Sequence, residues 1–309
     1  MTAARVNKGL HRAAAALACA TVVLLVAGAL VTSNEAGDSV PDWPLSFGRW
    51  LIGSDQFKAN VRFEFSHRVI AGAVGFLTAG FTAAVWLSKS ASKRLRMLSS
   101  IALCGVILQA MIGGLRVLFP AHKAEIAVPH ALIAQSFFVL VVAIAIVTSR
   151  SWNTATQSRT DVEGIGLAKL SATTVGAVLV QLVLGAGFRH GAFGITPHVA
   201  GAVVVTILIA VTTARTLRDH GDYAYLRKPA LLAFGLLIAQ IMLGISAYVA
   251  RVRSTAEAQP LEPMVSLTVA HVVVGALTLA AVLTLAMRSN QILASRSEQF
   301  ELRSRALAE

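Results

Sequence analysis

The sequence predicts an all-α integral membrane protein whose eight transmembrane helices form two pseudo-symmetric four-helix bundles. The first reason is composition: 56% of the 309 residues are hydrophobic and the mean hydropathy is +0.69. Only 14% are charged, against about 25% in a typical soluble domain. The second reason is a series of eight long apolar runs, and the third is an internal repeat that relates those runs in pairs.

Each apolar run is close to the roughly 20 residues that a helix needs to cross a bilayer. Backbone polar groups in lipid must be paired within their own segment, so we expect helices. The first run resembles a signal peptide in outline, but it is long enough to span, and we expect a retained first helix. The runs are 13–33, 67–87, 98–118, 129–148, 167–188, 197–214, 230–250 and 266–287.

The basic residues predict the orientation of these helices. The net charge is +12, but Lys and Arg lie between the apolar runs rather than in one patch, so we expect no nucleic-acid partner. With the N-terminus inside, 18 of the 27 Lys and Arg fall in inner segments. This bias predicts a multi-pass protein of the cell (inner) membrane with both termini cytoplasmic. The charged tail, 291–309, is expected to form a solvated or interfacial cytoplasmic helix.

The internal repeat consists of a glutamine, a glycine four residues later, and a histidine at the start of the next run. Chance similarity is common among Ala-, Val- and Leu-rich helices, but recurrence in order favours a duplication. It predicts an N-terminal half, 1–150, and a C-terminal half, 151–290. The three clear copies are Gln109, Gly113 and His130; Gln181, Gly185 and His198; and Gln240, Gly244 and His271. The first two runs form a fourth, degenerate copy that ends in His67.

The two cysteines, Cys19 and Cys104, both fall inside apolar runs. Neither a disulfide framework nor a Cys-ligated metal site is expected. We expect both to be small buried hydrophobic side chains.

Four histidines, His67, His130, His198 and His271, each begin an inward-going helix, which places them near the outer face. A single boundary histidine is usually a hydrogen-bonded interfacial residue, but four in matching positions favour metal binding. Imidazole suits iron, copper and zinc, and no carboxylate or thiolate cluster completes a zinc site. Two histidines facing each other across a four-helix bundle suit a haem iron. The sequence therefore predicts two haem-sized sites, His67 with His130 and His198 with His271.

Haem propionates need cations, and four arginines lie at the outer helix ends. They are either propionate contacts or anchors at the membrane interface. These candidates are Arg68, Arg116, Arg189 and Arg251. The role of His122 and His190, each eight residues before a repeat histidine, stays open.

Only one of the four histidines has an acidic neighbour. Glu64 stands three residues before His67, whereas the corresponding positions hold Ala127, Ile195 and Thr268. A bis-histidine pair without an acid is typical of electron transfer. The pair beside Glu64 is therefore the one at which we expect a substrate to change, with the carboxylate as proton acceptor or charge stabiliser. The alternative is that Glu64 only pairs with Arg62 or Arg68.

These residues together resemble the haem A synthase family. The resemblance rests on Glu64-x-x-His67-Arg68, Gly113-Gly114-Leu115, Pro129-His130, Arg189-His190, Pro197-His198 and Ala270-His271, and it covers most of residues 13–287. The stretch Val40-Pro41-Asp42-Trp43-Pro44 resembles one branch of that family. Some members carry an outer-loop cysteine pair that this sequence lacks, so a thiol-based electron path is not expected. Trp43 and Trp50 are expected either to cover a porphyrin edge as part of a lid or to anchor the loop at the interface.

The resemblance implies a haem-dependent oxidoreductase. It implies that the C8 methyl of haem O becomes a formyl group, by successive hydroxylations with oxygen from water, to give haem A for cytochrome oxidase. It implies that His198 and His271 hold haem b as cofactor, that His67 and His130 bracket haem O, and that Glu64 is catalytic. Haem O synthase, cytochrome oxidase assembly factors, an unidentified electron acceptor and a second copy of the chain are the partners to expect.

Two other functions remain open on the sequence alone. One is a non-catalytic bis-histidine haem b electron carrier, which needs the four histidines but not Glu64. The other is an assembly factor that handles haem without altering the macrocycle. A prenyl transferase is disfavoured, because no Asp-rich motif for a metal-bound diphosphate is present.

Overall fold

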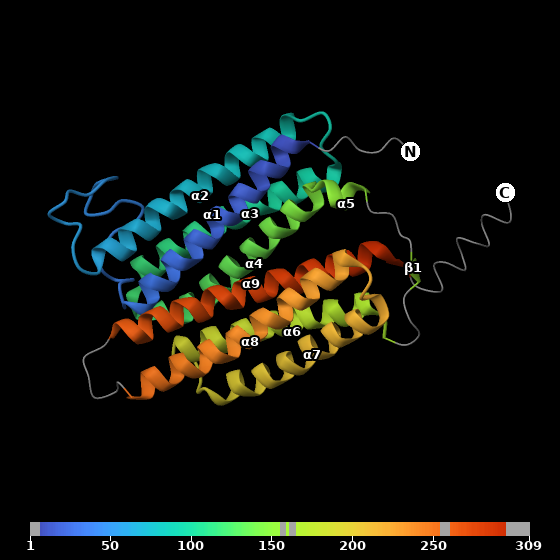
Figure 1. Ribbon diagram of the computed structural model, residues 1–309. Helices are drawn as coiled ribbons and strands as arrows, with labels where there is room; N and C mark the ends of the chain where they lie inside the picture. Colours follow the sequence, from blue (N-terminus) through green and yellow to red (C-terminus); the bar gives the residue numbers. More distant parts are fainter. Residues whose placement is uncertain (1–6, 155–158, 161–164, 254–259, 295–309) are drawn as a thin grey trace.

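The computed structural model describes residues 7–154, 159–160, 165–253 and 260–294 (Figure 1). Within these ranges eight long, apolar helices can each cross a membrane, as the sequence predicts. They are α1 (Lys8–Ser33), α2 (Val61–Leu87), α3 (Lys93–Leu118), α4 (Lys123–Thr148), α6 (Leu167–Arg189), α7 (Thr196–His220), α8 (Ala224–Arg253) and α9 (Glu262–Ile292). Shorter elements are η1 (Pro120–His122), α5 (Arg150–Thr154) and two strands, β1 (Arg159–Thr160) and β2 (Leu293–Ala294), which pair in parallel.

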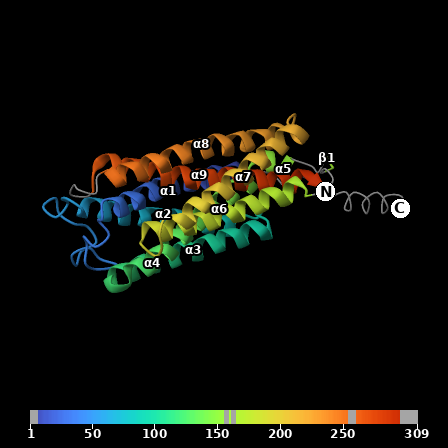
Figure 2. The same ribbon diagram turned by 90° about the horizontal axis from the view of Figure 1, so that it is seen from below.

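The long helices pack as two four-helix bundles that lie side by side (Figures 1 and 2). In the N-terminal bundle the neighbours around the ring are α1, α2, α3 and α4, with α4 returning to α1. In the C-terminal bundle they are α6, α7, α8 and α9, with α9 returning to α6. Helices α2 and α4 are therefore diagonal to each other, and so are α7 and α9. This arrangement decides where the histidines lie.

Helix α9 also joins the two bundles, because it packs against α1 and α4 as well as α6 and α8. Leu25 of α1, Phe138 of α4 and Ala276 of α9 form a buried cluster at this junction. Phe138 is only 2% exposed. Since fully burying such a side chain contributes about 1.5–3 kcal/mol in water, this junction would favour a fixed arrangement even outside lipid.

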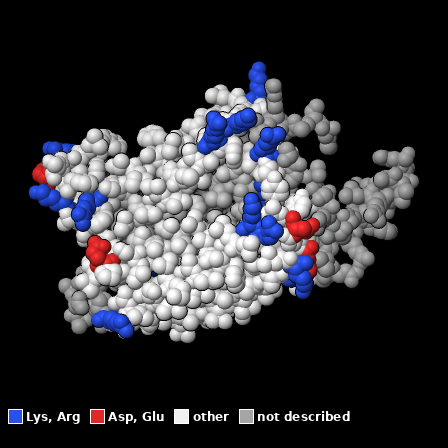
Figure 3. Space-filling view, in the orientation of Figure 1, with Lys and Arg blue, Asp and Glu red and all other residues white. Residues whose placement is uncertain are grey.

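The outer surface of the bundles is apolar between two charged ends. Large side chains such as Phe76, Leu87 and Met242 are more than half exposed. Lys and Arg gather at the two ends of the molecule, with a broad uncharged band between them (Figure 3). A surface of this kind is stable only against lipid, so the chain is a multi-pass membrane protein.

Three expectations about these elements need correction. The helices are longer than the apolar runs, because the helical backbone continues into the flanking polar residues. The aliphatic parts of long polar side chains can lie along the apolar surface there. Thus α4 begins six residues before Pro129, which lies inside the helix. Proline usually bends or breaks a helix at such a position, so the sequence favoured a later start. Cys19 and Cys104 are free but exposed on helix surfaces, not buried. The predicted tail overlaps the end of α9, and its residues 295–309 lie outside the described residues.

Candidate functional site: two histidine pairs at one end of the bundles

Each repeat histidine lies near the N-terminal end of its helix, and all four lie at the same end of the molecule. His67 and His130 stand on α2 and α4, and His198 and His271 stand on α7 and α9. Because these helices are diagonal partners in their bundles, each bundle presents two imidazoles from opposite corners. This is the arrangement predicted for a flat ligand held between helices.

A glycine on the neighbouring helix makes room for each imidazole ring. We name these residues the glycine seats: Gly28, Gly113, Gly185 and Gly244. A Cβ atom added at Gly28 or Gly113 would lie 3.2 Å from the Cε1 atom of His67 or His130. At Gly185 or Gly244 it would lie 2.9 Å from Cε1 of His198 or His271. Real Cβ atoms essentially never approach closer than 3.0 Å, so the C-terminal seats require glycine most strictly.

Three of the four histidines are also held by a glutamine, which we name the glutamine clamp: Gln109, Gln181 and Gln240. The amide Nε2 of Gln109 donates to the backbone carbonyl of His130 at 2.9 Å and lies 3.3 Å from the ring Nε2. Gln181 makes the same contacts with His198, at 2.9 Å to the carbonyl and 3.0 Å to Nδ1.

The third clamp differs in detail. The Nε2 atom of Gln240 lies 3.2 Å from Nε2 of His271, and the Nδ1 atom of that ring lies 3.2 Å from the Gln240 backbone carbonyl. The fourth histidine, His67, has no such partner: within the described part of the chain nothing hydrogen-bonds its ring, and its Nδ1 is buried. The clamp position, four residues before the seat, is held by Leu24 on α1.

The C-terminal pair fits the axial ligands of one haem iron. The ring centroids of His198 and His271 are 6.2 Å apart, with an angle of 79° between the ring planes. Two imidazoles on opposite sides of one metal ion have centroids about 6 Å apart, because a metal–nitrogen bond is about 2 Å long. Within the described residues, no group of three or more His, Cys, Asp or Glu could hold a metal ion. An iron ligated by a porphyrin needs only one or two side-chain ligands.

Glu64 is buried beside the N-terminal pair, and its carboxylate is fully engaged. Its Oε2 atom accepts hydrogen bonds from the Ser39 backbone N–H at 2.9 Å, the Ser39 hydroxyl at 3.0 Å and the Val40 N–H at 3.0 Å. Its Oε1 atom accepts from the Arg68 Nη2 atom at 2.6 Å. The Glu64 side chain is 5% exposed, so these contacts replace the water that the charge would otherwise need.

Arg68, the partner of Glu64 in this ion pair, binds the same segment of the chain that contains Ser39 and Val40. Its guanidinium donates to the backbone carbonyls of Val40 at 3.1 Å, Asp42 at 2.6 Å and Leu45 at 2.9 Å. Burial raises the pKa of Asp42, but hydrogen bonds from the Gly48 and Phe47 N–H groups outweigh burial and lower that pKa below its usual 3.8. Together Glu64 and Arg68 hold the first outer loop, which we call the fastened loop (residues 34–60), on the start of α2.

An aromatic side chain of the fastened loop packs over the N-terminal site. The Trp43 indole lies against Gly114, next to the seat at Gly113, so closely that a Cβ there would meet it at 2.6 Å. Trp50, by contrast, is 75% exposed. Trp43 is therefore the loop tryptophan that covers the bundle end. In the C-terminal bundle Phe193 packs on Gly187 in a comparable position, from a much shorter loop.

The four candidate arginines differ in what their side chains contact. Arg68 is committed to the fastened loop, and Arg189 donates to the Ser33 hydroxyl at 2.8 Å, which links α6 to the end of α1. The Arg251 guanidinium lies 5.3 Å from the centroid of the Phe188 ring. Arg116 lies under Gly37 of the fastened loop with a buried Nε that lacks a hydrogen bond within the described residues. Arg116 is thus the arginine best suited to receive an anionic group at the N-terminal site.

The two histidines of open role lie in different environments. His122 is exposed and its Nδ1 lies 2.6 Å from the Glu125 carboxylate. His190 follows α6, and burial together with the neighbouring Arg189 and Arg116 lowers its pKa to about 4. Its ring is therefore neutral at neutral pH and lies near arginines from both bundles.

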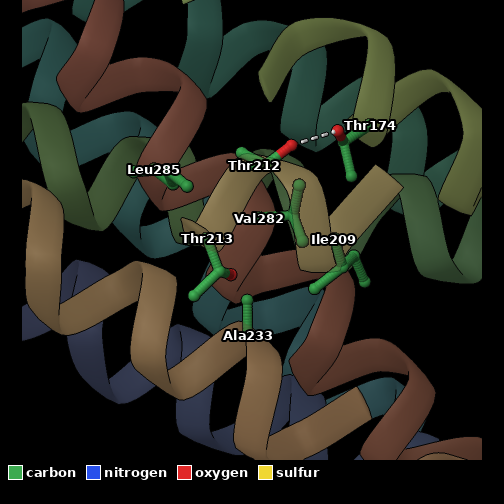
Figure 4. Close-up of a pocket in the computed structure, with 7 residues that line it drawn as sticks. All are labelled: Thr174, Ile209, Thr212, Thr213, Ala233, Val282 and Leu285. Atoms are coloured by element: carbon green, nitrogen blue, oxygen red, sulfur yellow. Dashed lines mark hydrogen bonds between the residues drawn. The ribbon is translucent and has the colours of Figure 1, made fainter. Parts of the chain in front are cut away.

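A small cavity elsewhere in the C-terminal bundle is not a second candidate. The space between its lining side chains is too small to hold a water molecule, whereas a typical ligand pocket holds about 300–1,000 Å³. Thr174 and Thr212 face each other across one side, with hydroxyl oxygens 3.0 Å apart (Figure 4). The other lining residues are Ile209, Thr213, Ala233, Val282 and Leu285.

Comparison with known proteins places this arrangement in a family. The family model described as COX15-CtaA, cytochrome oxidase assembly protein, matches residues 12–197. That is more than half of the chain, and it includes Glu64, His67 and His130. His198 and His271 lie beyond the matched residues.

Two relatives named heme A synthase cover more of the sequence than this model does, and a third covers less. The protein of Alkalihalophilus pseudofirmus is 26% identical over 247 residues, which are 73% of this chain and 82% of that protein. The protein of Symbiobacterium thermophilum is 30% identical over 258 residues, or 72% of this chain and 81% of that protein. That of Shouchella clausii is 32% identical over 136 residues, 44% of each chain. The chain therefore belongs to the COX15-CtaA family of cytochrome oxidase assembly proteins.

Proposed function

We propose that the chain is a haem A synthase, which oxidises the C8 methyl group of haem O to the formyl group of haem A for cytochrome oxidase. The observation that carries this proposal is the presence of two imidazole pairs on diagonal helices, one pair per bundle, in a member of this family. The names of the relatives support the activity. A pure electron carrier is not favoured, since it would need neither the fastened loop nor the acid beside His67.

The two pairs take different roles in this proposal. His198 and His271 hold haem b, which supplies one-electron transfer when bound. His67 and His130 bracket haem O, and the oxygen atom of the new formyl group comes from water. The conversion of a methyl group and one water to a formyl group releases four electrons and four protons, and an electron acceptor in the membrane would have to receive the electrons. Arg116, Arg189 and Arg251 receive propionates at the same end of the bundles.

Glu64 acts as a charge stabiliser rather than a proton acceptor. Three hydrogen bonds already converge on Oε2, and Arg68 donates to Oε1. Held by these contacts, the carboxylate would favour positive charge that develops nearby during oxidation. Through the fastened loop Glu64 also keeps Trp43 over the site and water away from it.

The proposed setting is the cell membrane, with both termini cytoplasmic and the histidines near the outer face. The excess of Lys and Arg in the inner segments supports this orientation. Haem O synthase would supply the substrate, and cytochrome oxidase assembly factors would receive the product. The exposed apolar flanks of the bundles are compatible with a homo-oligomer.

The deciding experiment is haem extraction from protein purified from a host that makes haem O, with the macrocycles identified by liquid chromatography. We expect haem b together with haem O, haem A or a hydroxylated intermediate. A Glu64→Gln variant should keep both haems and accumulate haem O. Two haem b molecules per chain, with no altered macrocycle in the wild type, would overturn the proposal in favour of an electron carrier.

A further inference from the structure

The fastened loop exposes a set of large apolar side chains. Trp50 and Leu51 are each 75% exposed, and Phe57 is 46% exposed. We name these three residues the loop cluster. The loop lies at the end of the N-terminal bundle beside the start of α2 (Figure 1), which is the level at which a spanning helix leaves the bilayer core. We propose that the loop cluster enters the headgroup layer of the membrane and that the basic side chains beside it bind lipid phosphates. This inference goes beyond the proposed function, because it involves no reaction.

A tight turn over residues 46–49 presents the first two members of the loop cluster. Its two end residues exchange backbone hydrogen bonds of 2.8 and 3.1 Å. The Asp42 carboxylate accepts from the two central N–H groups at 2.7 Å each. Trp50 and Leu51 follow this turn directly, so a braced backbone holds them exposed. Groups fixed in this way lose little conformational freedom when they meet a partner, which favours binding.

The third member joins the loop cluster to the lipid-facing surface of α2. The Phe57 ring packs edge to face against Phe65 in the first turns of α2, with ring centroids 6.3 Å apart and an angle of 83° between the ring planes. Phe65, Val69 and Phe76 share one face of the helix, because they are separated by four and seven residues. Val69 is 50% exposed and Phe76 is 83% exposed. The loop cluster thus continues a surface whose partner is the bilayer.

Basic residues flank the loop cluster. Segment 49–62 contains three basic residues and one acidic residue, all of them exposed: Arg49, Lys58, Arg62 and Asp55. The Arg62 guanidinium lies 4.7 Å from the centroid of the Phe63 ring. Lys and Arg side chains gather at this end of the molecule (Figure 3). Aromatic side chains next to cations are typical of protein segments at a membrane surface, and phosphate groups attract such cations. A bilayer therefore fits both the apolar and the charged part of this surface.

The fastened loop would then be held from two sides. Glu64 and Arg68 bind it to the start of α2, and it places Trp43 on Gly114. The loop cluster would bind it to lipid. Removing the lipid contact should therefore loosen the loop even though the Glu64–Arg68 ion pair is unchanged.

The first test measures where Trp50 lies when the full chain is in nanodiscs of phosphatidylcholine and phosphatidylglycerol, with one copy in each disc. Subtracting the emission of Trp50→Phe from that of the wild type isolates this indole from the other tryptophans. We expect bromine atoms on the upper part of the acyl chains to quench this emission, and aqueous iodide to quench it only weakly. Quenching by iodide and not by bromine would place Trp50 in water, and protection from both would place it against protein. Either result would overturn the inference.

The second test changes the chemistry of the surface. Trp50→Glu combined with Leu51→Glu places charges where the apolar side chains meet lipid, and Trp50→Phe combined with Leu51→Val is the matched control. We expect trypsin to cleave after Lys58 about 10-fold faster in the first variant, the factor that burial of one such side chain supplies. Both variants are compared in the same nanodiscs, and equal helical circular dichroism shows that both are folded. Equal cleavage rates would contradict the inference.

Neither readout requires haem or turnover. A chain that never alters a haem would refute the proposed function and leave this inference standing. A loop cluster that lies in water would refute the inference alone.

Discussion

The two bundles are built from the same helical hairpin, but they differ in the residues and loops that surround their histidines. The C-terminal bundle has two clamped histidines on tight seats, short connections and no acid at the position of Glu64. The N-terminal bundle has one clamped and one unclamped histidine, looser seats, and a long loop fastened by Glu64 and Arg68. The difference teaches that two copies of one hairpin can keep the same histidines while the residues around those histidines diverge, as the two roles proposed for the pairs require.

Removal of an axial ligand from the clamped pair should have the largest effect. We expect His198→Ala or His271→Ala to lose the C-terminal haem, because the second ring then faces the iron alone. Pyridine haemochrome analysis would show about one haem per chain instead of two. His122→Ala, which removes an exposed histidine paired with Glu125, is the control and should keep both haems. Full haem content in His198→Ala would show that the comparison of the bundles is wrong.

Loss of the loop fastening should have the next largest effect, confined to the N-terminal bundle. Glu64→Ala leaves Arg68 without its partner in a buried site, which typically costs about 3 kcal/mol or more. We expect rapid proteolysis within residues 34–60 and loss of turnover. Glu64→Gln keeps the shape and can still accept hydrogen bonds, so the loop should stay protected while turnover falls. Normal turnover in Glu64→Gln would leave only a structural role for this residue.

Filling the glycine seats should distinguish the bundles more finely. Gly185→Ala places a Cβ 2.9 Å from His198, whereas Gly113→Ala places one 3.2 Å from His130. Overpacking typically costs about 1–3 kcal/mol, so we expect a greater loss of haem content from the tighter seat. Gly176→Ala, in the same helix as Gly185 with nothing within 4 Å, is the matched control. A larger loss of haem content from Gly113→Ala than from Gly185→Ala would contradict this prediction.

The smallest effect concerns pH and the boundary between the bundles. The pKa of His190 is lowered from 6.5 to about 4, so the unfolded chain binds more protons than the folded one between these values. His190 therefore contributes stability that is present above pH 6.5 and is lost as the pH falls towards 4. We expect a loss on the order of 1 kcal/mol, allowing for partial exposure of the ring. Between these pH values the thermal unfolding temperature of His190→Gln should change less with pH than that of His122→Gln. Equal changes in the two variants would exclude His190 as the cause.

The helices and their pairing could be read from the sequence because both depend on local pattern. Eight apolar runs gave eight spanning helices, and the order of Gln, Gly and His related them in pairs. The ends of the helices could not be read in this way, because lipid thickness limits the apolar run but not the hydrogen-bonded backbone. The exposure of Cys19 and Cys104 was missed because hydropathy does not tell a lipid-facing side chain from a buried one.

The contacts of the site depended on tertiary structure and were only partly foreseeable. The seat at Gly28 was overlooked, since no glutamine stands four residues before it and the spacing between seat and histidine differs in every copy. The partners of Glu64 lie 24 and 25 residues away in an irregular loop, where no periodicity links them. The assignment of haem O and haem b to particular histidines stays a prediction.

The vacant clamp position on α1 has an evolutionary consequence. Leucine and glutamine codons can differ by a single base change, so a histidine without a clamping glutamine and one with it are a single mutation apart. In a chain built by copying a hairpin, the four imidazoles can thereby come to have different neighbours while the histidines themselves stay unchanged. Relatives with glutamine at the position of Leu24 would have four clamped histidines instead of three.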